Sequence, residues 1–255
     1  MTSRTASVSA GSLFLGVIVF LGVVVFLFFY LRPLVFLAQT KREFRNSPEI
    51  WLVPKPLLPA PIASPASRSK VVSYFGYQFD SPTPEVKEER NVEKVVVLSF
   101  SNCAVMAIFE PQANGPLTGL MQRGAPNAAR SFEDVYGKEA VRSDYDFRRT
   151  VLNMTPEDLR LIASPRQMVR NSVLLTLKSV DSQRFKNGLY SFETAAMHGF
   201  LEGDVALDHG VIIQAFDHED HLLTFVVTAR PDKSCFGQPE LNHIIFSLRP
   251  VAASE

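Results

Sequence analysis

The sequence has no excess of charge of either sign, because 26 Lys and Arg residues are balanced by 26 Asp and Glu residues. A nucleic-acid-binding protein needs a clustered basic face that displaces counterions from phosphates. Here the basic residues are scattered among the acids. The charge balance therefore argues against a nucleic-acid partner.

Catalytic and cofactor-binding motifs are also missing. The sequence has no GxSxG or SxxK pattern for a serine nucleophile, no Walker A loop and no GxGxxG that follows a strand. Cys103 combined with His198 or His243 is a free combination of residues without a motif. We therefore expect no cofactor, and the sequence favours a protein that is not an enzyme.

Cysteine is scarce, since the 255 residues contain only Cys103 and Cys235. Cys103 lies in the apolar run FSNCAVMAIF, whereas Cys235 lies in the polar stretch PDKSCFGQ. Two cysteines in unlike surroundings form no disulfide pattern, and an unpaired cysteine is commonly a small buried apolar residue. We therefore predict two free thiols.

One apolar stretch stands out, residues 13–31 with the sequence LFLGVIVFLGVVVFLFFYL, which contains no charge. A helix of that length just covers a hydrocarbon core of about 30 Å. The stretch is too long for a signal peptide and ends in Phe28, Phe29 and Tyr30 rather than in small residues. We predict a disordered tail over 1–12 and a single transmembrane anchor over 13–38, which contacts the lipid bilayer through residues 13–31.

The basic residues that flank this stretch bear on the side of the membrane. Arg32, Lys41, Arg42 and Arg45 follow it, whereas Arg4 is the only basic side chain before it. The positive-inside rule therefore favours a domain in the cytoplasm. A single N-terminal anchor is also a common way to display a domain outside, so the extracytoplasmic alternative stays open.

Prolines are dense after the anchor. They are Pro48, Pro54, Pro56, Pro59, Pro61 and Pro65. Because proline fixes φ and lacks a donor, this density predicts an extended, semi-rigid linker over residues 39–70. The remaining chain is long enough to fold without metals or disulfides. We predict one globular domain over 71–250 and a short tail over 251–255.

Alternating apolar residues predict strands over 71–80, 95–100 and 104–109. The clearest hairpin joins 210–217 to 222–229. The charged stretch 85–94 and the Gly- and Pro-rich stretch 115–129 predict loops.

Helical spacing of apolar residues predicts helices over 143–152, with Ser143 as the N-cap, over 165–180 and over 238–249. In the last helix the apolar stripe is Leu241, Ile244, Ile245 and Leu248, which we expect to lie on the sheet. The order of strands, helices, strands and helix predicts an α+β fold with an antiparallel sheet packed by helices.

Two stretches carry a resemblance to a known family. Gly76-Tyr77-Gln78-Phe79 in the opening strands, and the terminal run from Ile244 to Pro250, are similar to the PsbP-like sandwich family. The resemblance implies helices on both sides of an antiparallel sheet and a non-catalytic accessory or partner-binding role. It implies no functional residue.

A metal site is the most specific candidate chemistry, because imidazole and carboxylate ligands close together suit zinc or a similar ion. The candidate ligands are Asp217, His218, Asp220 and His221, together with Asp208 and His209. The alternative is a solvated hairpin turn, where charged side chains are expected in any case. A second candidate is general acid-base catalysis by Glu193, Glu202 and Asp204, since these acids are close in sequence.

The anchor, the linker and the missing motifs favour a single-pass membrane protein whose domain binds a protein or a small ligand without chemistry. The alternative is a membrane-tethered enzyme, a hydrolase, whose site is assembled from residues far apart in sequence. A deep pocket that joins His198, His209 or Cys103 to acids would favour the enzyme, whereas a flat apolar patch would favour the binding protein.

Overall fold

The computed structural model describes residues 19–27, 31, 35, 38, 39, 42, 52–59, 70–113, 126–155, 158, 178, 188–203, 210–230 and 236–251. Residues 19–27, part of the predicted anchor, are helical and exposed. Within the described residues no helix is both long and apolar enough to cross a membrane. The predicted helix over 165–180 lies outside the described residues except for Lys178.

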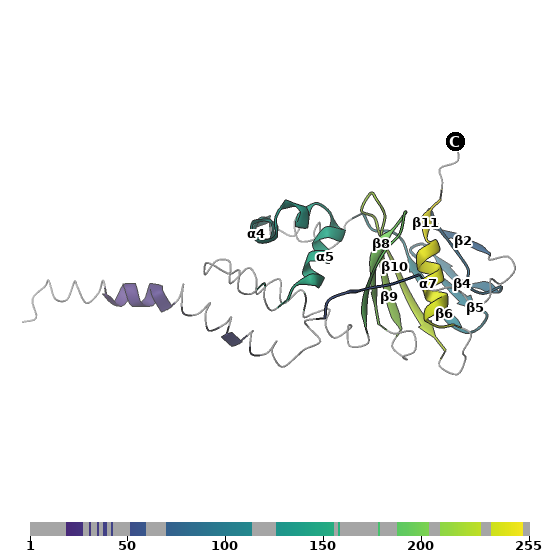
Figure 1. Cartoon of the computed structure of the whole chain (residues 1–255), viewed down its shortest axis with the longest axis horizontal. Coiled ribbons are helices and arrows are strands. Elements are labelled where there is room, and N and C mark those ends of the chain that lie inside the picture. The colour runs from purple at the N-terminus through teal and green to yellow at the C-terminus, as the bar shows by residue number, and fades with distance from the viewer. Residues whose placement is uncertain are drawn as a thin grey trace, which may run out of the picture.

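An eight-stranded sheet, which we call the large sheet, forms the centre of the domain (Figure 1). Its strand order is β1-β7-β8-β9-β10-β6-β5-β4. Neighbours are antiparallel except β1 and β7, which are parallel. The bounds are β1 Lys55–Pro56, β4 Val86–Val92, β5 Val95–Phe100, β6 Ala104–Phe109, β7 Leu189–Glu193, β8 His198–Glu202, β9 Val211–Phe216 and β10 Leu222–Ala229.

The main hydrophobic core lies between one face of the large sheet and a layer formed by helix α7 (Gln238–Ser247) and a small sheet. The small sheet has the order β11-β3-β2, with β2 Val71–Tyr74, β3 Tyr77–Asp80 and β11 Arg249–Pro250. The predicted stripe of the last helix is confirmed as core: Leu241, Ile244, Ile245 and Leu248 are each at most 2% exposed.

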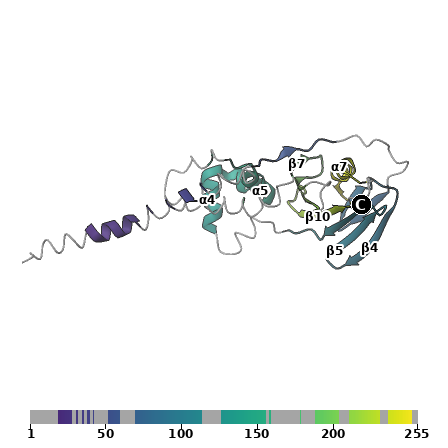
Figure 2. The same cartoon turned by 90° about the horizontal axis from the view of Figure 1, so that it is seen from below.

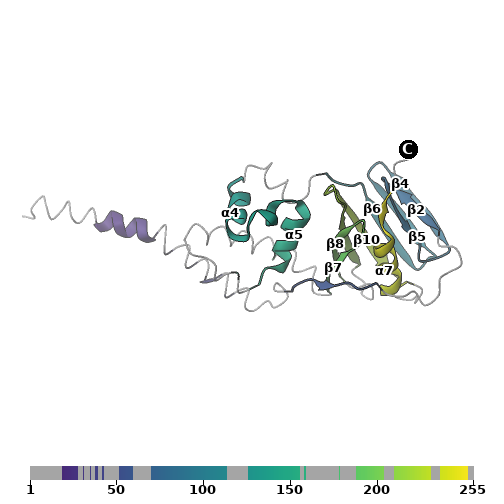
Figure 3. The ribbon, with the colours of Figure 1, turned by 45° about the horizontal axis from the view of Figure 1, so that its top comes forward.

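Helix α5 (Asp144–Asn153) covers the opposite face of the large sheet. Its Leu152 packs on Phe200 and Phe216, and the predicted N-cap is confirmed because the Ser143 side chain accepts a bond from the Asp146 N–H at 3.0 Å. Figure 3 shows α5 and α7 on opposite sides of β8 and β10. The predicted α+β class, a mostly antiparallel sheet packed by helices, is thereby confirmed.

Helix α4 (Pro126–Tyr136) and the short 3-10 helix η3 (Lys138–Val141) precede α5 (Figure 2). The predicted loop over 115–129 is therefore wrong for its last residues. Proline is favourable at the first position of a helix, where its missing N–H has no partner to lose, so Pro126 begins a helix rather than excludes one. Phe132 then joins α4 to α5, because its ring centroid lies 4.8 Å from that of Phe147.

The predicted loop over 85–94 is also wrong, since residues Val86–Val92 form strand β4 and pair with β5. Apart from Val86, all side chains of β4 are exposed. Polar residues therefore lose no solvation there, and charge on an edge strand discourages pairing with another chain. The charge of this stretch reflects its position at the sheet edge.

Part of the predicted linker belongs to the domain. Strand β1 pairs with β7, and the Leu57 N–H then donates to the Ser191 carbonyl at 2.7 Å. The Asn242 side-chain amide of α7 donates to the Leu58 carbonyl at 3.0 Å. Proline is tolerated at the edge of a sheet, where no partner needs its N–H. The folded part of the chain therefore begins before residue 71.

The prediction of two free thiols is wrong, because Cys103 is disulfide-bonded. The chain has one other cysteine, Cys235, which lies outside the described residues. Its described neighbours reach the same corner: the Arg230 N–H donates to the Cys103 carbonyl at 2.7 Å, and the Phe236 ring lies 5.7 Å from that of Phe100. The order of strands in the sheet thus brings the apolar stretch around Cys103 close to Arg230 and Phe236, the described residues on either side of Cys235 in the sequence.

Candidate functional site

The predicted metal ligands lie at the tip of the β9–β10 hairpin, where Asp217 is buried and organises the turn. One carboxylate oxygen of Asp217 accepts from the N–H groups of Glu219 and His221, both at 2.9 Å. The other accepts from the Tyr77 hydroxyl at 2.6 Å and lies 3.1 Å from Nδ1 of His221. Burial raises the pKa of Asp217, but these hydrogen bonds outweigh burial and hold it below its ordinary value.

The side chain of Asp220, in contrast to that of Asp217, binds the beginning of helix α5. Its two carboxylate oxygens accept from the Asp144 N–H at 2.5 Å and the Tyr145 N–H at 3.1 Å. The first N–H groups of a helix have no partner within the helix, and a carboxylate there is also favoured by the helix dipole. The backbone of Asp220 is left-handed, with φ of 65°.

The two histidines of the turn, His218 and His221, have different partners. Nε2 of His218 lies 3.0 Å from the Ala195 carbonyl, whereas His221 faces Asp217. Asp208 and His209 lie outside the described residues. In the part of the chain that the structure describes, no group of three or more His, Cys, Asp or Glu could hold a metal ion. The structure thus gives the described candidate ligands structural partners within the fold.

The acids considered for acid-base work are not brought together. Glu193 is the cross-strand partner of His198 and Glu202 that of Leu189, so these acids lie at opposite ends of β7 and β8. At about 3.3 Å per residue this separates them by about 13 Å along the strands. Glu202 is buried and pairs with Arg148 of α5 at 2.7 Å. Asp204 lies outside the described residues.

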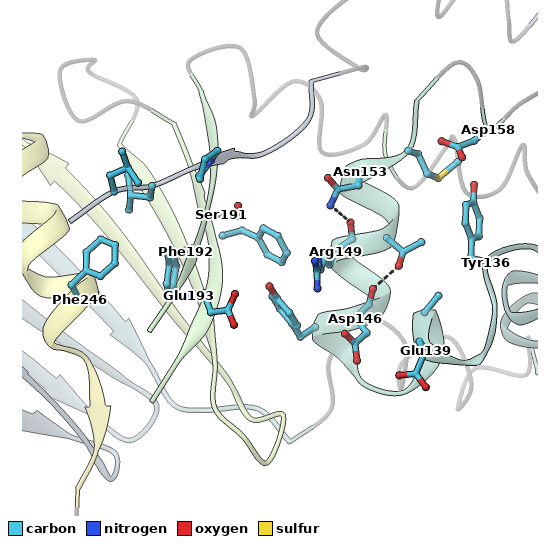
Figure 4. Close-up of a pocket in the computed structure, with 18 of the residues that line it drawn as sticks. Tyr136, Glu139, Asp146, Arg149, Asn153, Asp158, Ser191, Phe192, Glu193 and Phe246 are labelled. Atoms are coloured by element: carbon cyan, nitrogen blue, oxygen red, sulfur yellow. Dashed lines mark hydrogen bonds between the residues drawn. The ribbon is translucent and has the colours of Figure 1, made fainter. Parts of the chain in front are cut away.

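A cavity of about 840 Å³ opens between α5 and the β7 end of the large sheet (Figure 4). We call it the α5–β7 pocket. Its walls come from four parts of the chain: residues 56–59 at the sheet edge, described residues between Tyr136 and Asp158, strands β7 and β8, and Phe246 of α7. None of these segments forms the pocket alone.

Tyr145 and Phe200 line the pocket and belong to an aromatic cluster whose other members, His198 and Phe216, lie outside its wall. The ring of Tyr145 lies 3.9 Å from that of His198, 5.4 Å from that of Phe200 and 5.7 Å from that of Phe216, measured between centroids. Phe200 is fully buried. Burial raises the pKa of Tyr145, which Arg149 opposes and Glu193 reinforces. The Tyr145 ring is therefore fixed on the sheet and keeps its phenolic proton at neutral pH.

Most charged groups in the pocket wall already have partners. Asp146 accepts from Nε of Arg142 at 3.1 Å and from the Ser143 hydroxyl at 2.9 Å, and Glu139 also pairs with Arg142, at 2.9 Å. Asp158 accepts from the Thr155 N–H at 2.6 Å. Two wall charges make no ion pair or side-chain hydrogen bond with any described residue, Arg149 on α5 and Glu193 on β7.

One polar atom at the far end of the pocket also lacks a partner. The Tyr136 hydroxyl is buried and makes no hydrogen bond with the described residues. Burial is the main cause that raises its pKa, and the nearby carboxylate of Asp158 raises it further. A buried hydroxyl without a bond costs free energy, so this group is available to a polar group of a ligand.

The pocket contains acids but its wall includes neither His198 nor Cys103. Cys103 cannot be a thiolate nucleophile because it is disulfide-bonded. Sequence reasoning named Glu193 but missed Arg149, Tyr136 and Tyr145. The apolar spacing over 143–152 predicts the helix and places Arg149 away from its buried residues. Nothing in that spacing indicates which element faces Arg149.

Removing the carboxylate of Asp220 should loosen α5 from the hairpin. We expect Asp220→Gly, which tolerates positive φ, to lower the free energy of unfolding by about 1–3 kcal/mol, because two backbone N–H groups lose a charged acceptor. Asp220→Asn keeps an acceptor oxygen and should stay within about 0.5 kcal/mol of the original protein. Chemical denaturation of the full chain measures both. Equal losses in the two variants would contradict the capping role.

Acidification should destabilise the domain through His198. Burial lowers its pKa, as does His218, and both outweigh the opposite effects of Asp146, Asp220 and Glu193. The unfolded chain, with an ordinary pKa of about 6.5, therefore binds the proton more readily. We expect the free energy of unfolding to fall as the pH decreases from 7.5 to 5.5.

The variant His198→Phe keeps a ring on Tyr145 but cannot bind a proton, so it should lose part of this pH dependence. His243→Gln on α7 is the matched control and should keep the full dependence. Denaturation curves at the two pH values measure the effect, and an unchanged slope in His198→Phe would rule out this histidine as its source.

No family model, no curated protein and no solved structure matches the chain. The resemblance to the PsbP-like family therefore stays a prediction.

Proposed function

We propose that this chain is a non-catalytic binding protein on a single membrane anchor, and that its ligand occupies the α5–β7 pocket. The observation that carries the proposal is a cavity of about 840 Å³ that combines an aromatic wall with charged side chains lacking partners in the described chain. Sites for small ligands are typically concave and largely apolar, with a few polar groups that orient the ligand.

The walls of the pocket are held in place before any ligand arrives, which supports a binding role. Asp220 fixes the beginning of α5, the ion pair between Arg148 and Glu202 fixes its middle on β8, and Tyr145 stacks on Phe200. A preformed site spends less binding free energy on ordering its own groups. The pocket therefore suits reversible binding.

The disulfide at Cys103 supports a domain on the extracytoplasmic side of the membrane. Disulfides persist in oxidising compartments and are rare where glutathione and thioredoxin keep thiols reduced. The basic residues after the apolar stretch favour the opposite side. We give the disulfide more weight, because Cys103 is 1% exposed and is built into the core, whereas single N-terminal anchors commonly occur in both orientations.

Ligand binding should be lost when the pocket is filled. We expect a fragment screen by ligand-observed NMR, on the full chain in lipid nanodiscs, to yield ligands whose binding disappears in Ser191→Trp. Ser191 lines the pocket and lies opposite Phe200. Thr150→Trp, from the α5 wall of the same pocket, provides a second test if Ser191→Trp folds poorly.

The matched control is Thr228→Trp, because Thr228 is exposed on the same face of the large sheet, outside the pocket. It should retain binding. If none of the bound fragments is sensitive to Ser191→Trp or Thr150→Trp, the pocket is not the binding site.

The state of the thiols tests the side of the membrane. In membranes isolated without reductant and denatured in the presence of a maleimide, we expect no maleimide adduct on the chain unless a reductant is added first, and two adducts after reduction. Cys103→Ser should expose one reactive thiol without reductant. Labelling of both cysteines in the unreduced original protein would place the domain in a reducing compartment.

A further inference from the structure

The α5–β7 pocket presents two opposite charges to its ligand, Arg149 and Glu193. The side chain of Arg149 extends from α5 towards the sheet, and that of Glu193 extends from β7 towards the helix (Figure 4). Both act on Tyr145, because Arg149 lowers its pKa and Glu193 raises it. The two charges therefore lie near one aromatic ring without pairing to each other.

The other acids of the wall do not compete for a ligand in the same way. Asp146 and Glu139 share Arg142, and Asp158 accepts from Thr155. These three acids already have an ion-pair or hydrogen-bond partner within the protein. Among the described charges of the pocket, only Arg149 and Glu193 make no ion pair or side-chain hydrogen bond with a described residue, so a ligand would supply the first such partner.

The apolar part of the pocket wall includes the ring of Tyr145, which is only partly buried. One side of this ring is stacked on the buried ring of Phe200, with an interplanar angle of 23° and a centroid distance of 5.4 Å, and the other side is free of that contact. Such a surface accepts an aromatic ring or an aliphatic chain through offset stacking and exclusion of water. The pocket therefore combines one cation and one anion that lack partners among the described residues with an apolar surface.

Resting on the proposed binding function, we infer that the ligand is a zwitterion with an apolar side group, such as an aromatic amino acid or a short peptide. Its carboxylate binds the guanidinium of Arg149, which matches carboxylates in a bidentate geometry, and its ammonium binds Glu193. A ligand that has a carboxylate but no ammonium offers no partner to Glu193 and is repelled by its charge. A ligand that has an ammonium but no carboxylate is in the same way repelled by Arg149. Both lose one favourable contact and gain a repulsion.

Isothermal titration on the full chain in lipid nanodiscs tests this inference with four probes. L-phenylalanine and the dipeptide alanyl-phenylalanine carry both charges at different separations, whereas 3-phenylpropionate lacks the ammonium and phenethylamine lacks the carboxylate. We expect one of the zwitterions to bind at least tenfold more tightly than either analogue with a single charge. Tighter binding of the amino acid or of the dipeptide identifies the source of the zwitterion.

Two variants assign the charges. Arg149→Gln should weaken binding of the zwitterion and of 3-phenylpropionate about three- to tenfold, and leave phenethylamine unweakened. Glu193→Gln should do the reverse for the two analogues. Lys87→Gln and Glu89→Gln are the matched controls, since this exposed pair lies on β4 at the other edge of the large sheet.

The outcomes separate this inference from the function on which it rests. The analogues could bind in a manner that Ser191→Trp abolishes, yet without a preference for a zwitterion or without a response to Arg149→Gln and Glu193→Gln. That result would overturn the ligand class and leave the binding function standing. If no probe and no screened fragment binds in a manner sensitive to Ser191→Trp or Thr150→Trp, both fail.

Discussion

Two carboxylates at the tip of the β9–β10 hairpin connect the two faces of the large sheet. Asp217 accepts the Tyr77 hydroxyl from the small sheet, and three residues later Asp220 accepts the first N–H groups of α5. The layer that closes the main core and the helix that forms the pocket therefore depend on one turn. Charge at a hairpin tip commonly keeps a turn soluble, but here it supplies a buried acceptor, Asp217, and a partly buried one, Asp220, for groups that otherwise lose their hydrogen bonds.

The parts of the fold that could be predicted are those in which apolar periodicity and burial coincide. Strand β5, the β9–β10 hairpin and helix α7 each bury one face, so spacing was sufficient to identify them. Strand β4 could not be found in this way, because an edge strand with both faces exposed has no alternation to detect. Strand β1 was hidden by its prolines, which indicate extended chain but not whether a sheet edge receives it.

The candidate site was less predictable, because its determinants are relations between segments. Arg149 and Glu193 are ordinary charges in sequence, and they come to line one pocket only because α5 packs over β7 and β8. The disulfide at Cys103 follows the same logic, since the pairing of β10 with β6 brings Arg230 beside it. A count of cysteines cannot supply that order of strands.

The position of β1 links the pocket mechanically to the proposed anchor. Residues 56–59 form one wall of the pocket, and residues 32–51 are the chain between that wall and the apolar stretch. A fully extended chain of this length spans about 70 Å. In the proposed anchored protein, tension from the bilayer would reach the domain first at a short edge strand rather than in the core. Such tension would load the same strand that lines the α5–β7 pocket, so the affinity for the proposed ligand and the distance from the membrane would be coupled quantities.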